Sequence, residues 1–388
     1  MAWITGYAYL TGLIAVVITL AWTGAEFIYG MANVLNVTQI DSQGPSVGLY
    51  IGLIVAGTLY NMLGLRYSAY LNKFMVVWVL IGSIVVIVAV PAMAPTHKSA
   101  RWVFTEFQNT TGYENNSMAF LIGLLSAGWA QIGYECGAQI VEGTQNAATT
   151  APRGIIICVI SAFVQGLVLI VSTLFSIQDV DELLASDMPI ATFFLHATNN
   201  PSVTAFFLFI LFVAQMGSLC NSILAAATFA WSLARDGILP CSRFLYKISG
   251  DRNIPVNCLI VQLVICVLVI LPSFGSTVYW QAIMSAAVIS VNVSYGLPLL
   301  CRLIWVRNDM PKGPFHLGKL GLPLNFISVV WVVFFGVILC IPSTYPVTPE
   351  TMNWASVMIG GVMLFSIFFW MISGRHTFKG ITETVVYN

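Results

Sequence analysis

One stretch of the chain decides the fold: Ala119-Phe-Leu-Ile-Gly-Leu-Leu-Ser-Ala-Gly-Trp-Ala-Gln-Ile-Gly-Tyr-Glu-Cys-Gly-Ala-Gln-Ile-Val-Glu142. It is long and apolar enough to cross a bilayer, yet it is interrupted near its middle by Gly128, Gly133 and Gly137 together with Gln131, Tyr134 and Glu135. Glycine lowers helix propensity. Gly133 lies about 15 residues from the start, which is roughly 22 Å at 1.5 Å per residue. This pattern predicts a discontinuous helix whose free backbone ends line a binding site.

The composition of the whole chain points to a lipid environment. Of 388 residues, 15 are Lys or Arg and 15 are Asp or Glu, so only 8% are charged, against about 25% in soluble domains. Hydrophobic residues make up 58% and the mean hydropathy is +0.88. With a net charge of zero and no basic block, a nucleic-acid partner is excluded. The cysteines and histidines have no metal-site spacing, so the sequence predicts no metal, no cofactor and no disulfide framework.

Ten apolar runs are candidates for membrane-spanning helices, and we expect one all-α polytopic transmembrane domain over residues 1–388 with a short tail at 374–388. The first run is too long for a signal peptide, so we expect it to be a true span. The predicted runs are 7–33, 47–64, 69–94, 118–147, 154–177, 202–232, 255–273, 277–304, 323–342 and 354–373.

Charge asymmetry predicts the orientation. Basic residues on the side of the termini are Arg66, Lys73, Arg153, Arg235, Arg243, Lys247, Arg252, Arg302, Arg307, Lys312, Lys319, Arg375 and Lys379, whereas the other side has only Lys98 and Arg101. The positive-inside rule then makes both termini cytosolic. The glycosylation sequons at Asn36, Asn109 and Asn115 all fall in loops assigned to the outside, which is an independent agreement.

Three carboxylates lie within apolar runs, and each must face protein or water. For Glu135 a site or gate role is favoured over a buried structural pair. For Glu142, seven residues further on the same helix face, a structural pair with Arg153 is favoured over a place in the pathway. Glu26 either lines the pathway or extends its side chain to the outer surface, and neither role is favoured.

Two further residues have alternative interpretations. Trp129 is either an aromatic lid over the break or a packing tryptophan. Asn221, beside Ser222 and a run of small residues, either lines the site or joins two helices by a hydrogen bond, and the second reading is slightly favoured.

Several segments resemble a known family. Trp129-Ala-Gln-Ile-Gly-Tyr-Glu135, followed by Glu142 and Ala151-Pro-Arg-Gly154, resembles the sixth transmembrane helix and following loop of the amino acid/polyamine/organocation permease superfamily. Other segments resemble its fungal amino acid, GABA and choline permease branch: Ala234-Arg-Asp-Gly-Ile-Leu-Pro240, Ile254-Pro-Val-Asn257, Gly321-Leu-Pro-Leu-Asn325 and Met352-Asn-Trp-Ala-Ser356.

The resemblance implies a LeuT-like inverted-repeat fold that works by alternating access and is coupled to protons. It implies Trp129 as an outer gate, Gly133 and Tyr134 as unwound backbone, and Glu135 as a gate or proton-sensitive group. Gln131, Asn221 and Ser222 are further substrate-site candidates, with Ser222 where some relatives have an aromatic residue. Trp78 stands where some bacterial relatives have a lysine.

The first span resembles the family's third helix, so we expect a chain that lacks the family's first two helices. Two functions remain open on this basis. One is a secondary transporter for amino acids or amines such as GABA or choline, in the plasma or vacuolar membrane. The other is a non-transporting regulatory or nutrient-sensing protein derived from such a permease. An enzyme is disfavoured because no set of catalytic groups is recognisable.

Overall fold

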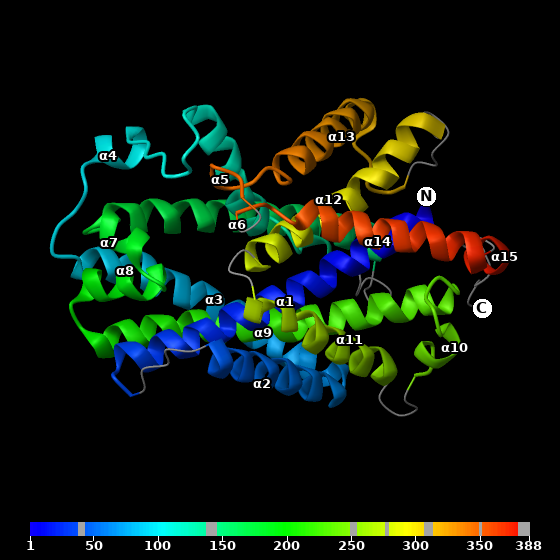
Figure 1. The fold of residues 1–388 in the computed structure, drawn as a ribbon, viewed down its shortest axis with the longest axis horizontal. Coiled ribbons are helices and arrows are strands. Elements are labelled where there is room, and N and C mark those ends of the chain that lie inside the picture. The colour runs from blue at the N-terminus through cyan, green and yellow to red at the C-terminus, as the bar shows by residue number, and fades with distance from the viewer. Residues whose placement is uncertain are drawn as a thin grey trace. The chain divides into compact units, whose positions relative to one another are not determined.

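The computed structural model describes residues 1–37, 43–136, 146–248, 254–275, 279–305, 313–348 and 351–378, and within these ranges every regular element is a helix (Figure 1). The long helices are α1 (Ala2–Val34), α2 (Gln43–Met62), α3 (Leu65–Met93), α5 (Asn116–Ala130), α6 (Ala147–Phe175), α9 (Pro201–Arg235), α11 (Val256–Val269), α12 (Tyr279–Trp305), α13 (Gly321–Ile338) and α14 (Ala355–Phe369). The short ones are α4 (Ala100–Thr105), α7 (Val180–Ala185), α8 (Pro189–Thr198), α10 (Ser242–Leu245), η2 (Leu271–Gly275), η3 (Gly318–Leu320), η4 (Trp370–Gly374) and α15 (Arg375–Thr377).

Ten of the described helical segments are long and apolar enough to cross a membrane, one for each predicted run. Their ends agree with the predicted runs to within a few residues at most positions; the run predicted at 202–232, for example, is the span Pro201–Arg235. The all-α polytopic prediction is therefore confirmed. Of the basic residues used to predict orientation, Arg252, Arg307, Lys312 and Lys379 lie outside the described residues.

The short helices of the connections were not predicted, but their starts follow from local sequence. Ser99 Oγ accepts a hydrogen bond from the Trp102 backbone N–H at 3.2 Å, and α4 begins there. Asp179 accepts from the backbone N–H groups of Asp181 and Glu182 at the start of α7. Such side-chain caps satisfy donors that a helix start leaves free.

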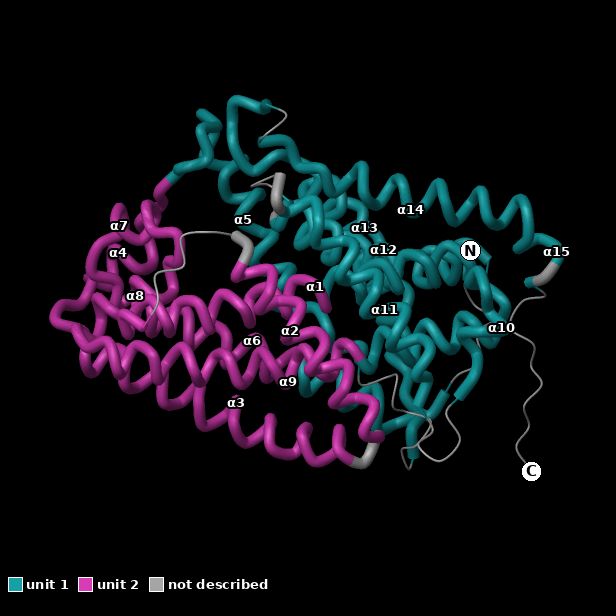
Figure 2. Tube along the Cα trace, turned by 60° about the horizontal axis from the view of Figure 1, so that its bottom comes forward, with its two compact units in different colours: residues 1–16, 109–158, 224–388 teal, residues 17–108, 159–223 magenta. Residues whose placement is uncertain are grey.

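The chain forms two compact units, each assembled from separate segments (Figure 2). The first unit comprises residues 1–16, 109–158 and 224–388, and the second comprises 17–108 and 159–223. The helices α1, α6 and α9 each pass from one unit into the other.

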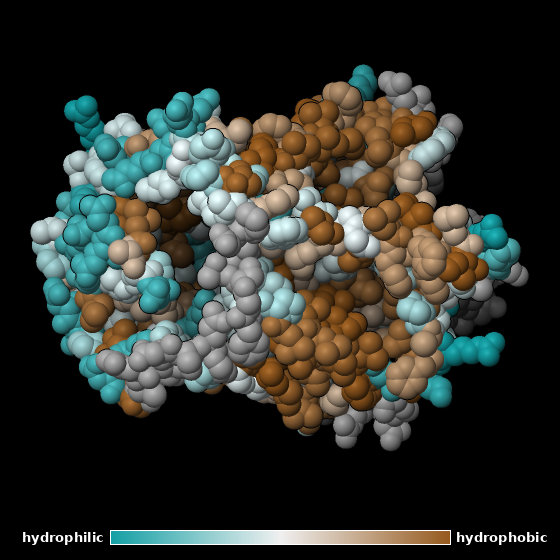
Figure 3. Space-filling view, viewed as in Figure 1, coloured by the Kyte–Doolittle hydropathy of each residue, from teal (hydrophilic) through white to brown (hydrophobic). Residues whose placement is uncertain are grey.

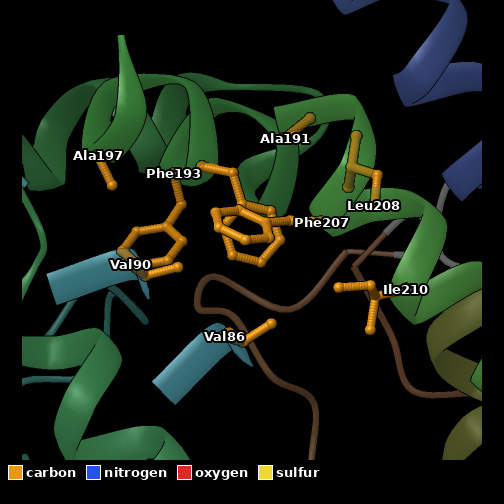
Figure 4. Packing of buried hydrophobic residues seen from close by; sticks show 9 residues of the cluster. Val86, Val90, Ala191, Phe193, Ala197, Phe207, Leu208 and Ile210 are labelled. Atoms are coloured by element: carbon orange, nitrogen blue, oxygen red, sulfur yellow. The ribbon is translucent and has the colours of Figure 1, made fainter. Parts of the chain in front are cut away.

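The core of the second unit is aromatic and joins α8 to its neighbours. Phe193 and Phe194 of α8 pack with Phe207 of α9 and with Val86 and Val90 of α3 (Figure 4). Ring centroids of Phe194 and Phe207 are 5.3 Å apart, which is a favourable aromatic separation. The burial of these side chains explains why a connection between two spans contains an ordered ten-residue helix.

The core of the first unit joins the end of α5 to α12 and α13. A Cβ atom added at Gly128 would lie 2.3 Å from Cζ of Phe335, so only glycine permits this approach. Phe335 belongs to a buried cluster with Val288 of α12 and Leu339, and Trp129 packs against it. The end of α5 is thus fixed in position by packing.

Large hydrophobic side chains are exposed over much of the surface, as the brown areas of Figure 3 show. On α6 no described residue is buried, and Ile157, Phe163 and Leu167 are all exposed. Soluble monomers rarely expose contiguous apolar surface of this extent, whereas a bilayer requires it. The protein is therefore an integral multi-pass membrane protein.

Candidate substrate site at the interrupted helix

The predicted interruption of the fourth span is present. Helix α5 ends at Ala130, Gln131 follows as its C-terminal cap, and residues 134–136 form a single 3-10 turn. Gly133 has φ +91°, in the region that favours glycine, and a Cβ atom there would meet nothing within 4 Å. Backbone conformation is thus the reason for glycine at position 133. Gly137 and Glu142 lie outside the described residues.

The turn after Gly133 places a carboxylate in the interior of the first unit. Tyr9 Oη of α1 donates a hydrogen bond to Glu135 Oε1 at 3.2 Å. The other oxygen, Oε2, is buried and has no partner of strict hydrogen-bond geometry among the described residues, although the Tyr295 phenol lies close enough to interact with the carboxylate. An oxygen that is buried without a well-formed hydrogen bond is costly, so Oε2 is available to a proton or a cation.

Aromatic rings surround this carboxylate. Tyr9 packs edge-to-face on Phe229 of α9 with ring centroids 4.7 Å apart. Tyr134 packs on Tyr295 of α12 at 5.4 Å, and Tyr295 also packs against the cluster that contains Tyr9. We call Glu135 together with Tyr9, Tyr134, Phe229 and Tyr295 the Glu135 cluster.

The phenol of Tyr295 completes the polar part of the cluster. It interacts electrostatically with Glu135, Tyr134 and Tyr9 and lies near enough to Glu135 for a weak hydrogen bond, but its buried hydroxyl has no partner of strict hydrogen-bond geometry among the described residues. The cluster therefore combines one carboxylate, one hydroxyl that can donate or accept, and several aromatic faces. Such a set can hold an ammonium group by ion pairing and by cation–π contact.

Trp129 and Gln131 lie on either side of the end of α5. Trp129 packs against the buried cluster of α12, α13 and α14, so its packing role is observed, and its role as a lid stays a prediction. The backbone N–H of Gln131 bonds to the carbonyl of Gly128 at 3.3 Å and closes the last turn.

The other predicted site residues belong to the second unit. Asn221 Nδ2 of α9 donates to Asn72 Oδ1 of α3 at 2.7 Å, which is the interhelical bond that the sequence slightly favoured. Ser222 is half-buried in the same helix. Glu26 is exposed on α1 and accepts a bond from Trp22 Nε1 at 2.8 Å.

The three sequons differ in local structure. Asn36 is exposed directly after α1 with φ +54°. Asn109 Nδ2 donates to the carbonyl of Tyr113 at 2.7 Å, and Asn115 caps α5 by accepting from the Ser117 backbone N–H at 2.9 Å. Glycosylation at these positions stays a prediction.

Sequence reasoning missed Tyr9, Phe229 and Tyr295. Each occurs in an apolar run far from Glu135 along the chain, and only the packing of α1, α9 and α12 brings them together. For the two tyrosines the available signal was a hydroxyl-bearing aromatic residue inside an apolar run, since a buried Tyr hydroxyl usually finds a polar partner. Phe229 offered no such signal.

Comparison with known proteins supports the sequence resemblance. A family model described as Amino acid permease matches residues 1–364. An amino-acid permease BAT1 homolog of Oryza sativa subsp. japonica is 29% identical over 98% of this chain and 76% of its own length. An uncharacterized amino-acid permease of Schizosaccharomyces pombe is 30% identical over 98% of this chain and 71% of its own length.

A choline transporter of Saccharomyces cerevisiae is 28% identical over 76% of this chain and 54% of its own length. These relatives are permeases and transporters rather than enzymes. With the family match over residues 1–364, they show that this chain belongs to the amino acid permease family.

Proposed function

We propose that this protein is a secondary active transporter that moves amino acids or related amines, such as GABA or choline, across a membrane by alternating access and coupled to protons. The observation that carries the proposal is the half-buried Glu135 carboxylate, of which Oε1 is bonded to Tyr9 while the buried Oε2 has no partner of strict hydrogen-bond geometry among the described residues. A transporter for ammonium compounds needs such an acceptor inside the protein.

The aromatic rings of the Glu135 cluster support an amine as the bound group. Tyr9, Tyr134, Phe229 and Tyr295 lie around one carboxylate. Ammonium groups, including quaternary ones, are attracted to aromatic faces, and the attraction is larger where water is excluded. The names of the amino-acid and choline relatives agree with this class of substrate.

The unwound backbone supports a second binding element for the substrate. Because α5 ends at Ala130, the carbonyl end of its dipole points into the turn that contains Gly133. We assign Gln131, Gly133 and Tyr134 to this cradle and Trp129 to the gate above it. Ser222 stays a predicted substrate-site residue and Glu26 a predicted pathway residue, whereas the bond of Asn221 to Asn72 favours a helix contact over its predicted place in the site.

Coupling to protons follows from the same carboxylate in this proposal. When the substrate ammonium leaves, Oε2 of Glu135 needs a new partner, and a proton is the smallest cation that supplies one. The carboxylate would therefore bind substrate and proton in turn. We propose the plasma or vacuolar membrane as its location. The distribution of basic residues supports an orientation with both termini cytosolic.

The test is radiolabelled uptake of GABA, choline and a mixed amino-acid pool by the 388-residue chain in transport-deficient cells. Uptake that exceeds that of empty-vector cells, rises with a proton gradient and is lost in Glu135→Gln supports the proposal. The matched control is Glu114→Gln, because Glu114 is an exposed acid of a connection and should leave uptake unchanged. A correctly inserted chain that neither binds nor takes up any of these compounds overturns the proposal and favours the regulatory alternative.

A further inference from the structure

A cavity that plays no part in the Glu135 cluster lies elsewhere in the first unit. Its volume is about 390 Å³, and it is bordered by residues of α1, α9, α10 and α11. Its walls include Leu10, Ala230, Phe244, Val261 and Ile265, and none of the residues of the Glu135 cluster lines it. The volume is within the range of small-molecule sites.

One polar side chain, Gln262 of α11, lines this otherwise apolar cavity. Gln262 is only 6% exposed, and neither its Oε1 nor its Nε2 has a hydrogen-bond partner among the described residues. Buried amides in proteins are almost always hydrogen-bonded. A group that is buried, unpaired and part of a cavity wall therefore indicates a partner that occupies the cavity.

The chemistry of Gln262 restricts that partner. Its amide offers one acceptor and one donor group side by side, which a single hydroxyl satisfies because a hydroxyl both donates and accepts. An ionised carboxylate or phosphate only accepts, and no Lys or Arg lines the cavity to neutralise it. The remaining walls require a bulky apolar body.

The source of the ligand follows from the surroundings of α11. Ile260, Val264 and Leu268 of this helix are exposed large hydrophobic residues, and in a membrane-spanning helix such a face contacts lipid. Apolar molecules of the bilayer therefore lie directly beside a helix that forms one wall of the cavity. We propose that this cavity binds an uncharged membrane lipid with a single hydroxyl, of the sterol class, whose hydroxyl bonds to the Gln262 amide.

Binding there has a structural consequence. The ligand would contact Leu10 of α1 and Ala230 of α9, which directly follow Tyr9 and Phe229 of the Glu135 cluster in the sequence. It would thus hold together the helices that present two of the aromatic rings. This site is independent of the proposed transport function, because its binding can be measured without any substrate.

The experiment uses the purified full chain in phosphatidylcholine nanodiscs with and without a photoreactive cholesterol analogue. We expect crosslinks to peptides of α9, α10 or α11, and an increase of the melting temperature by the sterol through preferential binding to the folded state. Ala230→Phe fills the cavity and should abolish both effects. Gln262→Leu keeps the size of the side chain and should weaken sterol binding about 10-fold, as expected for loss of its hydrogen bonds.

The matched control is Val264→Leu on the exposed face of α11, which should bind the sterol like the original chain. Gln262→Leu should fold at least as well without sterol, since it removes an unpaired buried amide. Equal labelling of the original chain and Ala230→Phe would overturn the proposal. So would sterol affinity that is unchanged or increased in Gln262→Leu, or the absence of any sterol effect on the original chain, which would leave water as the partner of the amide.

Discussion

Two polar side chains of the second unit form hydrogen bonds between helices, whereas a carboxylate of the first unit is only partly paired. In the second unit Asn221 bonds to Asn72 at 2.7 Å, and Trp78 Nε1 bonds to the carbonyl of Ile210 at 3.1 Å. In the first unit the carboxylate of Glu135 uses only one of its oxygens. The helices α3 and α9 run unbroken through the paired groups, whereas α5 stops just before the unpaired one. We interpret the two paired groups as contacts between helices, and the partly paired carboxylate as the position where the proposed substrate binds.

The largest expected effect comes from Glu135→Gln. An amide keeps the shape of the side chain but has no charge for an ammonium group or a coupled proton. Loss of a hydrogen bond to a charged group costs about 1.5–3 kcal/mol, so uptake per inserted molecule should fall about 10- to 150-fold. Initial-rate uptake, normalised to surface protein, measures this. An unchanged rate would place Glu135 among the structural groups and remove the distinction between the two units.

The next effect concerns the break itself, and Gly133→Ala tests it. A side chain at φ +91° costs about 1–2 kcal/mol of unfolding free energy. Gly336→Ala is the matched control, because a Cβ atom there also meets nothing within 4 Å but the backbone is helical. Gly336→Ala should raise the free energy of unfolding by roughly 0.5–1 kcal/mol. Thermal unfolding in detergent measures both changes in stability. Equal changes for Gly133→Ala and Gly336→Ala would mean that the fold does not require the positive φ of Gly133.

A smaller effect is expected for the paired groups of the second unit. Asn221→Leu and Asn72→Leu, alone and together, form a double-mutant cycle in denaturation experiments. Hydrogen bonds between membrane helices contribute about 0.6 kcal/mol on average and at most about 1.7 kcal/mol, so a coupling of that size is expected. Uptake per folded molecule should stay unchanged. If uptake is lost and the cycle shows no coupling energy between Asn221 and Asn72, Asn221 belongs to the substrate pathway and not to the helix contact.

The sequence predicted the break but not its partners, and the reason is physical. Gly133 and its polar neighbours are local signals, since glycine conformation and helix propensity act within a few residues. The spans were predictable because bilayer thickness fixes their length. Tyr9 and Tyr295 were not predicted as partners of Glu135, because contacts across helices depend on which face each helix presents to the others. The sequence left two interpretations of Asn221 open, because a polar residue in a span can either line a site or join two helices by a hydrogen bond.

The smallest effect is expected for the hydroxyl of Tyr9 alone, which can be removed while the ring is kept. Tyr9→Phe removes the 3.2 Å bond to Glu135 and keeps the edge-to-face contact with Phe229. A single hydrogen bond contributes about 1 kcal/mol, so apparent substrate affinity should fall about fivefold, well below the effect of Glu135→Gln. Tyr113→Phe is the matched control, because it also removes one hydroxyl bond, to the Pro342 carbonyl at 3.0 Å, and Tyr113 lies outside the cluster, in the connection before α5. If both tyrosine variants lower melting temperature slightly but only Tyr9→Phe changes the KM of uptake, the hydroxyl positions the carboxylate for substrate. If the two variants behave alike, the Tyr9 bond is one more structural pair, and the proposed binding role then depends on Oε2 of Glu135 alone.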